Sequence, residues 1–445
     1  MTAGRRLRLT LALLAAVTVL LAIAYWRTPR IVALTPAPSS RDASTAAELR
    51  LRFSSPLRPP YPQLQLAPLV SGTQRFEDNT LVFSPAEPLA PATTYTVTLA
   101  GNAAGTAGPC LRCRLLRWSF QTASLAILYV AWDEDGNPQL WRTEDGSQAE
   151  MLTAAGDGIG DYAVSPHGDT IVYSARRAGG GADLWRTGRD GQGTRALLPC
   201  PDALCDGAVW DPGAQRLVYV RRPLTESGPG VPRLYWLDAV SGATEPVFAN
   251  PEQAGWFPRF SPNGEWLAFV EPGAPPSVLA YPLDGGAPQL LPGETTAAVG
   301  WHPRENRFLS SVIVYEGERI STHLYTVGAE TGSIQDISGD LSTDDSGAAW
   351  SPAGDWIAFA RKVARAPVGK QIWLMRPDGS EAQPLTSDPD SNFSNLSWSP
   401  DGQYLLAQRF ALEGSGVGPE VWLVEPATGD KTLIAAPAFL PAWLP

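Results

Sequence analysis

The sequence predicts an all-β protein with an N-terminal membrane anchor, and three observations favour that class. Its 445 residues include 42 glycines and 42 prolines, too many turn formers for a protein of long helices. Its 16 Trp, 12 Tyr and 13 Phe residues need an apolar interior, which excludes a disordered chain. Apolar and polar residues alternate over short runs, and one motif recurs seven times at intervals of 41 to 50 residues.

The charge of the chain is unevenly distributed. Residues 1–122 carry 13 Lys and Arg against 5 Asp and Glu, whereas residues 123–445 carry 21 against 40. The two parts therefore have net charges of +8 and -19, which sum to the -11 of the whole chain. This shift predicts a domain boundary near residue 122. An acidic chain is also a poor partner for phosphate backbones, so we expect no nucleic-acid binding.

Residues 1–28 read as a signal-anchor segment. Three arginines, Arg5, Arg6 and Arg8, precede an uncharged apolar run at residues 9–25. As a helix this run spans about 26 Å, slightly less than the hydrocarbon core of a bilayer. The arginines place the N-terminus in the cytoplasm, so we expect a single-pass protein of the cell membrane whose later domains are extracytoplasmic. The alternative is a signal peptide cleaved near Ala24, which releases a secreted protein.

Residues 29–122 read as a small β-sandwich. Apolar residues alternate with polar ones in four short runs separated by turn residues, which is typical of strands with one buried face. These runs include Leu49 to Phe53, Leu81 to Phe83, Tyr95 to Leu99 and Trp118 to Phe120. The only titratable groups that gather there are arginines, so we expect no catalytic site in this segment.

The same segment resembles the bacterial Ig-like domain of the surface-layer (SbsA-type) family. The resemblance rests on the motifs Arg50-Leu51-Arg52-Phe53-Ser54-Ser55-Pro56-Leu57, Asn79-Thr80-Leu81-Val82-Phe83-Ser84-Pro85, Leu89-Ala90-Pro91-Ala92-Thr93-Thr94-Tyr95-Thr96-Val97-Thr98-Leu99 and Trp118-Ser119-Phe120-Gln121-Thr122. Members of that family act as spacers and adhesion modules on bacterial envelopes. The resemblance thus implies a structural role.

The four cysteines fall into two close pairs, Cys110 with Cys113 and Cys200 with Cys205. Local disulfides in an oxidising compartment are the interpretation we favour, although four cysteines allow three pairings. The spacing of Cys110 and Cys113 also suits a redox motif or half of a zinc site, but the pair lies between strand patterns and opens no helix.

Residues 123–445 contain an internal repeat. A motif of a hydrophobic residue, any residue and then proline recurs seven times and ends at Pro166, Pro212, Pro262, Pro303, Pro352, Pro400 and Pro445. Each period also has an aliphatic-aromatic strand: Leu140-Trp141, Leu184-Trp185, Leu234-Tyr235, Leu279 to Tyr281, Leu324-Tyr325, Ile372-Trp373 and Val421-Trp422. Four short strands in a period of this length are typical of a β-propeller blade, so the sequence predicts seven blades.

The first period has no proline motif before it, and the last motif, Trp443 to Pro445, has no strand after it. We therefore expect the C-terminal segment to supply the missing innermost strand of the first blade and so to close the propeller.

The repeat resembles the WD-like propellers of TolB-type periplasmic proteins, whose blades carry a Ser-Pro-Asp-Gly turn. The motif is complete at Ser399-Pro400-Asp401-Gly402 and degenerate at Ser165-Pro166-His167-Gly168, Ser261-Pro262-Asn263-Gly264 and Ser351-Pro352-Ala353-Gly354. TolB-type proteins usually have six blades behind an α/β domain, so the partners of the Tol system are not implied here.

Chemical motifs are scarce. We find no catalytic, cofactor-binding or metal-binding motif: His167, His302 and His323 lie in three different repeats, and there is no nucleophile elbow or phosphate loop. The acidic clusters at residues 133–137 and 340–345 do not fit a calcium loop, although a calcium site between blades stays open. The tryptophans of the repeat motif read as packing residues. Trp256 and Phe257 lie outside that register and are our candidate contact residues, as are the longer loops at 178–181, 224–231 and 363–369.

The first functional hypothesis is a non-catalytic, membrane-anchored extracytoplasmic protein whose propeller loop face binds an envelope protein or a glycan. The second is a propeller enzyme that acts on polysaccharide, a lyase or a glycosidase, which requires two carboxylates or a set of Tyr, His and Arg side chains that converge on the central channel. The third is a sensor that holds a small ligand or a metal in the channel.

Overall fold

A computed structural model describes residues 29–445 except 58, 60, 101–115, 292–294, 296–299, 340–342, 364–368 and 413–417. These residues form strands and turns without a helix, so the prediction of an all-β chain is confirmed for them. In this part of the chain no helix is long and apolar enough to cross a membrane. The predicted anchor at residues 9–25 and the pair Cys110 and Cys113 lie outside the described residues. The chain divides into two compact units, Met1–Ser124 and Leu125–Pro445.

The first unit consists of two antiparallel sheets around one core. One sheet has the order β1-β2-β5-β4, with β1 at Ile31–Thr35, β2 at Leu49–Phe53, β5 at Thr80–Pro85 and β4 at Gly72–Glu77. The other has the order β3-β6-β7, with β3 at Gln63–Ala67, β6 at Thr94–Ala100 and β7 at Leu116–Gln121. The alternating residues Leu49, Leu51 and Phe53 are buried as predicted, and they pack against β6 and β7 residues in a single cluster.

The sequence suggested that only arginines gather in this segment, but on the sandwich these arginines form ion pairs with glutamates. Arg50 and Arg75 both bind Glu48, at 2.7 and 2.9 Å, and Arg75 also binds Glu77 at 2.8 Å. Ser84 donates a further hydrogen bond to Glu48 at 2.5 Å. Burial opposes ionisation of Glu48, but the bonds from Ser84, Arg75 and Arg50 outweigh it and lower the pKa of that carboxyl to about 2.

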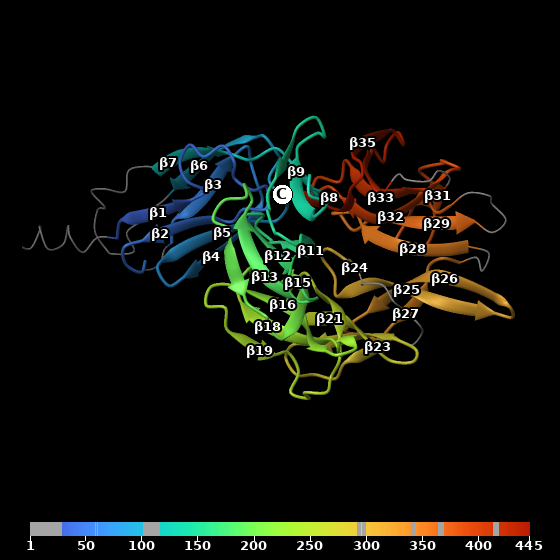
Figure 1. Ribbon diagram of the computed structural model, residues 1–445. Coiled ribbons are helices and arrows are strands. Elements are labelled where there is room, and N and C mark those ends of the chain that lie inside the picture. Colours follow the sequence, from blue (N-terminus) through green and yellow to red (C-terminus); the bar gives the residue numbers. More distant parts are fainter. Residues whose placement is uncertain are drawn as a thin grey trace, which may run out of the picture. The chain divides into compact units, whose positions relative to one another are not determined.

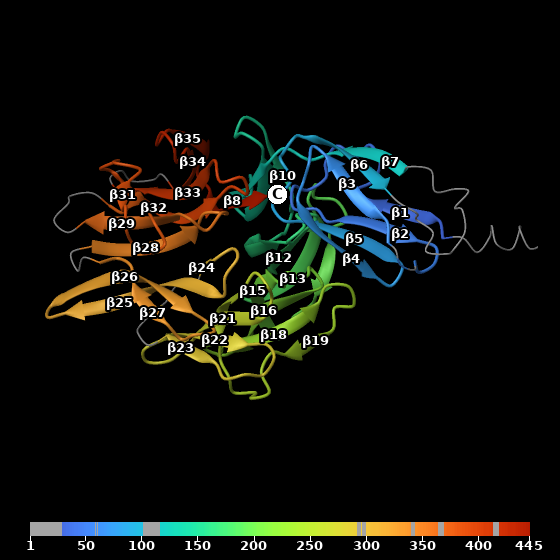
Figure 2. The same ribbon diagram turned by 180° about the vertical axis from the view of Figure 1, so that it is seen from behind.

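The second unit repeats one sheet pattern along the chain. Five sheets have four strands, and a nine-stranded sheet contains two further groups joined by a single parallel bridge between Ala182 and Leu204. In chain order, the sheets follow one another around a common centre, from green through yellow to red (Figure 1, Figure 2). From the group that begins at Ile159 to the group that begins at Ser391, the first strand of each contacts the first strand of the next.

The bounds of the strands are as follows. The first sheet comprises β8(Ala126–Trp132), β9(Pro138–Thr143), β10(Ala149–Met151) and β36(Phe439–Leu444). The nine-stranded sheet comprises β11(Ile159–Val164), β12(Thr170–Arg176), β13(Ala182–Gly188), β14(Arg195–Leu198), β15(Ala203–Trp210), β16(Arg216–Thr225), β18(Arg233–Asp238) and β19(Thr244–Pro246), with β17(Gly228–Pro229) paired to β16. Two sheets follow, with β20(Trp256–Phe260), β21(Trp266–Glu271), β22(Ser277–Pro282) and β23(Gln289–Leu291), then β24(Gly300–Trp301), β25(Arg307–Glu316), β26(Arg319–Gly328) and β27(Ile334–Asp336). The last two comprise β28(Thr343–Trp350), β29(Ile357–Val363), β30(Gln371–Met375) and β31(Gln383–Pro384), then β32(Ser391–Trp398), β33(Leu405–Ala411), β34(Glu420–Val424) and β35(Lys431–Ala435).

The end of the chain pairs with the first repeat, as the repeat count predicts. Strand β36 runs antiparallel to β8, with Trp443 opposite Ile127 and Leu444 opposite Ala126. The Tyr162 hydroxyl on β11 donates a hydrogen bond of 2.6 Å to the Leu440 carbonyl on β36. The C-terminal segment thus links the first two strand groups.

The apolar cores of the second unit lie between neighbouring sheets. Consecutive clusters join each strand group to the next, from the cluster of Leu128 and Ile171 to that of Phe393 and Leu405. A last cluster brings Tyr129 of β8 together with Leu406 of β33, so that the final group also packs against the first. This circuit of shared cores is the packing of a propeller-like fold.

Candidate functional site

The first strands of the second unit line a cavity of about 820 Å³. Its walls come from β11, β15, β20, β32 and β36, together with side chains from β16 and Pro232. This volume lies within the usual range of small-molecule pockets. The cavity is therefore the candidate functional site of this unit.

A repeated kink shapes these strands. The residue five positions before the motif proline has a positive φ in five of the strands: Gly207 (58°), Phe257 (52°), Gly347 (62°), Asn395 (48°) and Leu440 (51°). The strand register shifts at each of these positions, which marks β-bulges. Side chains other than glycine rarely adopt this conformation, so Phe257, Asn395 and Leu440 are held there by their surroundings.

Tryptophans of the repeat motif connect adjacent first strands. The indole N–H groups donate to backbone carbonyls of the preceding strand group at 3.0 to 3.3 Å, in the pairs Trp210 to Ala163, Trp301 to Arg259, Trp350 to Gly300, Trp398 to Ala349 and Trp443 to Ser397. Among these five only Trp350 is buried, because the other indoles also reach solvent or the cavity. Packing, the role the sequence suggests, is thus combined with a hydrogen bond.

Two carboxylates lie side by side at the cavity wall. Asp161 accepts hydrogen bonds of 2.5 Å from the Ser174 hydroxyl and from the Gly207 backbone N–H. Asp206, the neighbour of Gly207, forms an ion pair with Arg222. Burial and the negative charge of Asp161 raise the pKa of Asp206 to about 6, against the opposing effect of Arg222.

Arg259 is the second cation of the cavity lining, besides Arg222. Its side chain is exposed to the water of the cavity, and partial desolvation by the cavity walls lowers the pKa of its guanidinium. Its one hydrogen bond among the described residues runs to its neighbour, the Pro258 carbonyl, at 2.8 Å. Asp161 is near enough to favour the charged form, but no described carboxylate lies within ion-pair distance.

The two contact residues expected from the sequence take different places. Phe257 is 44% exposed and lines the cavity. Trp256 also borders the cavity, but its ring is half-buried and packs against two apolar clusters. The structure thus brings Phe257 to the site surface, and the prediction that both residues contact a partner stays open.

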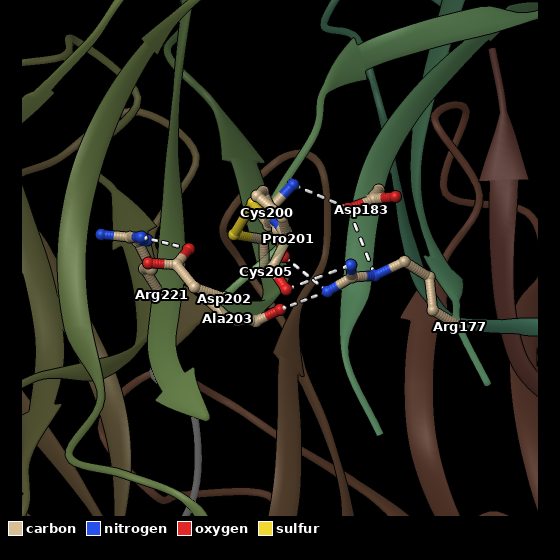
Figure 3. The surroundings of a disulfide bond; sticks show 8 residues. All are labelled: Arg177, Asp183, Cys200, Pro201, Asp202, Ala203, Cys205 and Arg221. Carbon is tan, nitrogen blue, oxygen red and sulfur yellow. Dashed lines mark hydrogen bonds and ion pairs between the residues drawn. A yellow bond between two sulfur atoms is a disulfide. The ribbon is translucent and has the colours of Figure 1, made fainter. Parts of the chain in front are cut away.

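A disulfide joins Cys200, in the connection between β14 and β15, to Cys205 on β15 (Figure 3). Arg177 donates to the carbonyls of Cys200 and Ala203, and Asp183 accepts from the Cys200 N–H at 2.7 Å. Figure 3 shows Arg177 and Asp183 on the side of the disulfide loop away from Asp202 and Arg221. This network holds the loop beside a second, smaller pocket, which Arg177 lines together with Asp161 and Asp206.

The histidines lie away from the cavity lining. His323 is buried, with its Nδ1 atom 2.8 Å from Asp336, and His302 is buried against the Trp350 ring. Within the described ranges no three His, Cys, Asp or Glu residues gather as metal ligands. Asp133, in the acidic cluster considered for calcium, accepts hydrogen bonds from the Asp135 and Asn137 N–H groups.

Comparison with known families assigns the first unit. Residues 27–122 match the bacterial Ig-like domain. The Ig-like domain spans the predicted sandwich, in agreement with the motifs that suggested it. The search of curated proteins gave no match.

Solved structures resemble the chain at low sequence identity, which shows the fold alone. A puromycin hydrolase has a TM-score of 0.53 at 16% identity, over 71% of this chain and 53% of that chain. A puromycin-hydrolyzing peptidase from Mycobacterium tuberculosis has a TM-score of 0.52 at 16% identity, over 70% and 52%. TolB from Acinetobacter baumannii has a TM-score of 0.44 at 18% identity, over 73% and 83%. The chain thus spans about half the length of the two hydrolases.

Sequence reasoning missed the charged residues of the cavity. Asp161, Asp206 and Arg259 precede their motif prolines by five, six and three residues. Aligning the repeats on the prolines would have placed all three on first strands, where their side chains stand out among the apolar and small residues of other repeats. Arg222 lies on β16 and has no comparable signal.

Proposed function

We propose that the protein is a non-catalytic extracytoplasmic interaction protein, held at the cell membrane by residues 9–25. In this proposal residues 123–445 form a seven-bladed β-propeller closed by β36, and its loop face binds an envelope protein or a glycan. The Ig-like domain serves as a spacer between the anchor and the propeller.

The observation that carries this proposal is a group of exposed apolar side chains on three consecutive sheets. They stand where the second strand of each sheet leads to the third: Tyr315, Ile320, Val363, Phe410 and Leu412. A Cβ atom at Gly369, in the connection after β29, would lie 3.0 Å from the Leu412 side chain, so two of these connections adjoin. Isolated exposed apolar residues are normal, but a group of this kind favours a binding surface.

The loops that the sequence singled out support the same surface. Residues 178–181, 224–231 and 363–369 all connect the second and third strands of their groups, and such connections lie at one end of every sheet. Their length and the exposed side chains beside them are typical of the binding face of a propeller.

A second candidate function, an enzyme that acts on polysaccharide, is favoured by the Asp161 and Asp206 pair. A glycosidase uses one carboxyl with a raised pKa as the acid and an ionised carboxylate as its partner. Here, however, Asp161 accepts bonds from Ser174 and Gly207, and Asp206 is paired with Arg222. These protein partners occupy the groups that a substrate would need, so we favour binding over catalysis.

Site-specific photo-crosslinking in intact cells tests the proposal. A photoreactive residue replaces Tyr315 in one variant and Val240, which is 86% exposed in the turn after β18, in a matched control. We expect a discrete adduct from position 315 and none from position 240. Equal adducts from both positions, or no adduct from either, would contradict a binding face at position 315. Carbonate extraction of the same membranes should leave the full chain in the pellet, and its release would contradict the anchor.

A further inference from the structure

We propose that the cavity of the second unit is a binding site for a small organic monocarboxylate with an apolar body, whose charge pairs with Arg259. This site is separate from the exposed apolar side chains of the proposed binding face, and it does not depend on that face. The proposal rests on the charge balance and on the lining of the cavity.

Arg259 forms no ion pair with a carboxylate of the described residues. Of its guanidinium donors, only Nη1 has an acceptor among the described residues, the Pro258 carbonyl. The Arg259 side chain is exposed to the water of the cavity, so its other N–H groups are free to bind a ligand there. The nearest carboxylate, Asp161, has both oxygens in hydrogen bonds to Ser174 and Gly207. A ligand carboxylate could instead take two parallel N–H bonds from the guanidinium.

The other charges of the cavity limit the ligand to one anionic group. Asp161 and Asp206 border the same space, and only Asp206 has a cationic partner, Arg222. A second anionic group on the ligand would face the Asp161 carboxylate at close range. A polyanion, such as a chain of uronic acids, is therefore a poor fit.

The remaining walls favour an apolar body. Phe257, Trp398, Pro232, Pro400 and Leu440 contribute aromatic, proline and aliphatic surface to the lining. Phe257 and Leu440 both lie at β-bulges of the strands that form the walls, where their φ angles are positive. A ring or a short aliphatic chain attached to the carboxylate would remove this surface from water.

Isothermal titration of the full chain with 3-phenylpropionate tests the proposal, with 3-phenylpropanamide as the uncharged match. We expect the acid to bind with a dissociation constant below about 1 mM and the amide to bind at least about tenfold more weakly, because the amide forms no charge-assisted pair. A peptide arm compares acetyl-Ala-Ala-Phe as free acid and as amide. Tighter binding of the peptide acid would identify a chain terminus as the source of the carboxylate.

Two substitutions and a control assign the binding to Arg259. R259Q should weaken binding of the acid at least about tenfold, whereas R259K should retain part of it. D161N should strengthen binding, because it removes a negative charge that repels the ligand carboxylate across the cavity. R176Q removes an exposed arginine outside this cavity and should change nothing. Equal binding of acid and amide, or of R259Q and the natural chain, would overturn the proposal, as would no binding at 10 mM acid, a concentration chosen about tenfold above the expected constant.

Discussion

The two units of this chain bury their apolar side chains in different ways. The Ig-like domain has one continuous cluster, in which Leu49, Leu51 and Phe53 of β2 contact residues of both sheets. The second unit instead shares each cluster between neighbouring sheets, and the last cluster joins β33 to β8. A defect in the first unit therefore stays local, whereas the second unit depends on contacts between parts of the chain that lie far apart in sequence.

Deletion of residues 438–445 should produce the largest effect, and it should destabilise the second unit without changing the first. It removes β36, the fully buried Leu444 and the bond from Tyr162 to Leu440, and it exposes the pairing edge of β8. Calorimetry of the full chain should show the melting temperature of the second unit lowered by about 10 °C or more, since more than one large core side chain is lost. The Ig-like transition should not move. An unchanged melt of the second unit would show that β36 does not hold it closed.

A core substitution in the Ig-like domain should have the opposite pattern. Leu51 is fully buried in β2, so L51A should destabilise this domain by about 2–5 kcal/mol through lost burial and a cavity. The matched variant V32A truncates a side chain that is 58% exposed on β1 and should have little effect. Calorimetry again provides the measurement, and a shift of the second transition by L51A would contradict two independent cores.

The contrast also explains how much of the fold the sequence could predict. Strands β2, β5, β6 and β7 were predicted because a buried face alternates with a solvent-exposed face. Strands β3 and β4 were missed: prolines flank β3, and its buried Leu64 and Leu66 are the only apolar signal among glutamines. The third strands of the second unit were all found, because six of the seven bury an aliphatic residue directly before an aromatic one. In the seventh, β22, the motif residues Leu279 and Tyr281 are half-buried and alternate with the buried Val278 and Ala280.

The candidate site was largely beyond the reach of sequence reasoning. Spacing between repeats predicts that first strands adjoin, but not which side chains meet in the space between them. Asp161 and Asp206 are 45 residues apart in sequence and interact only because β11 and β15 contact each other. The left-handed conformation of Phe257 and Leu440 has no glycine or asparagine to announce it. This conformation instead arises at the β-bulges, where tertiary contacts hold the backbone.

Loss of one indole hydrogen bond should have a smaller effect than either change above. Trp398 donates to the Ala349 carbonyl at 3.2 Å, so W398F should lower the free energy of unfolding of the second unit by about 1 kcal/mol. Trp266 lies in the same unit, and its indole N–H has no bond to a described residue, which makes W266F the matched control for a changed ring. Equal effects of the two variants in denaturant titrations would show that the rings stabilise this unit by packing alone.

The two charged clusters differ in the direction in which they shift a carboxyl. Glu48 has three donors, so its pKa is lowered to about 2, whereas Asp206 has one cation and a like-charged neighbour, so its pKa is raised to about 6. A lowered pKa adds stability above the unfolded value of 4.5, and this contribution is lost as the pH falls towards 2. A raised pKa adds stability below the unfolded value of 3.8, and this contribution is lost as the pH rises through 6. The contributions of these two carboxyls should thus respond to acid in opposite senses.

Melting curves between pH 2 and pH 8, in steps of about half a unit, test this smallest effect. E48Q should remove the acid-dependent loss of Ig-like stability, a change of about 1 kcal/mol at most because Arg50 and Arg75 are partly exposed. D206N should remove the inflection near pH 6 in the second transition and leave the Ig-like profile as it was. The variant E77Q provides a control, because Glu77 is nearly half exposed beside the same arginines. If E77Q removes the acid response as fully as E48Q does, then the buried position of Glu48 does not cause that response. The two clusters would then differ only in their net charge.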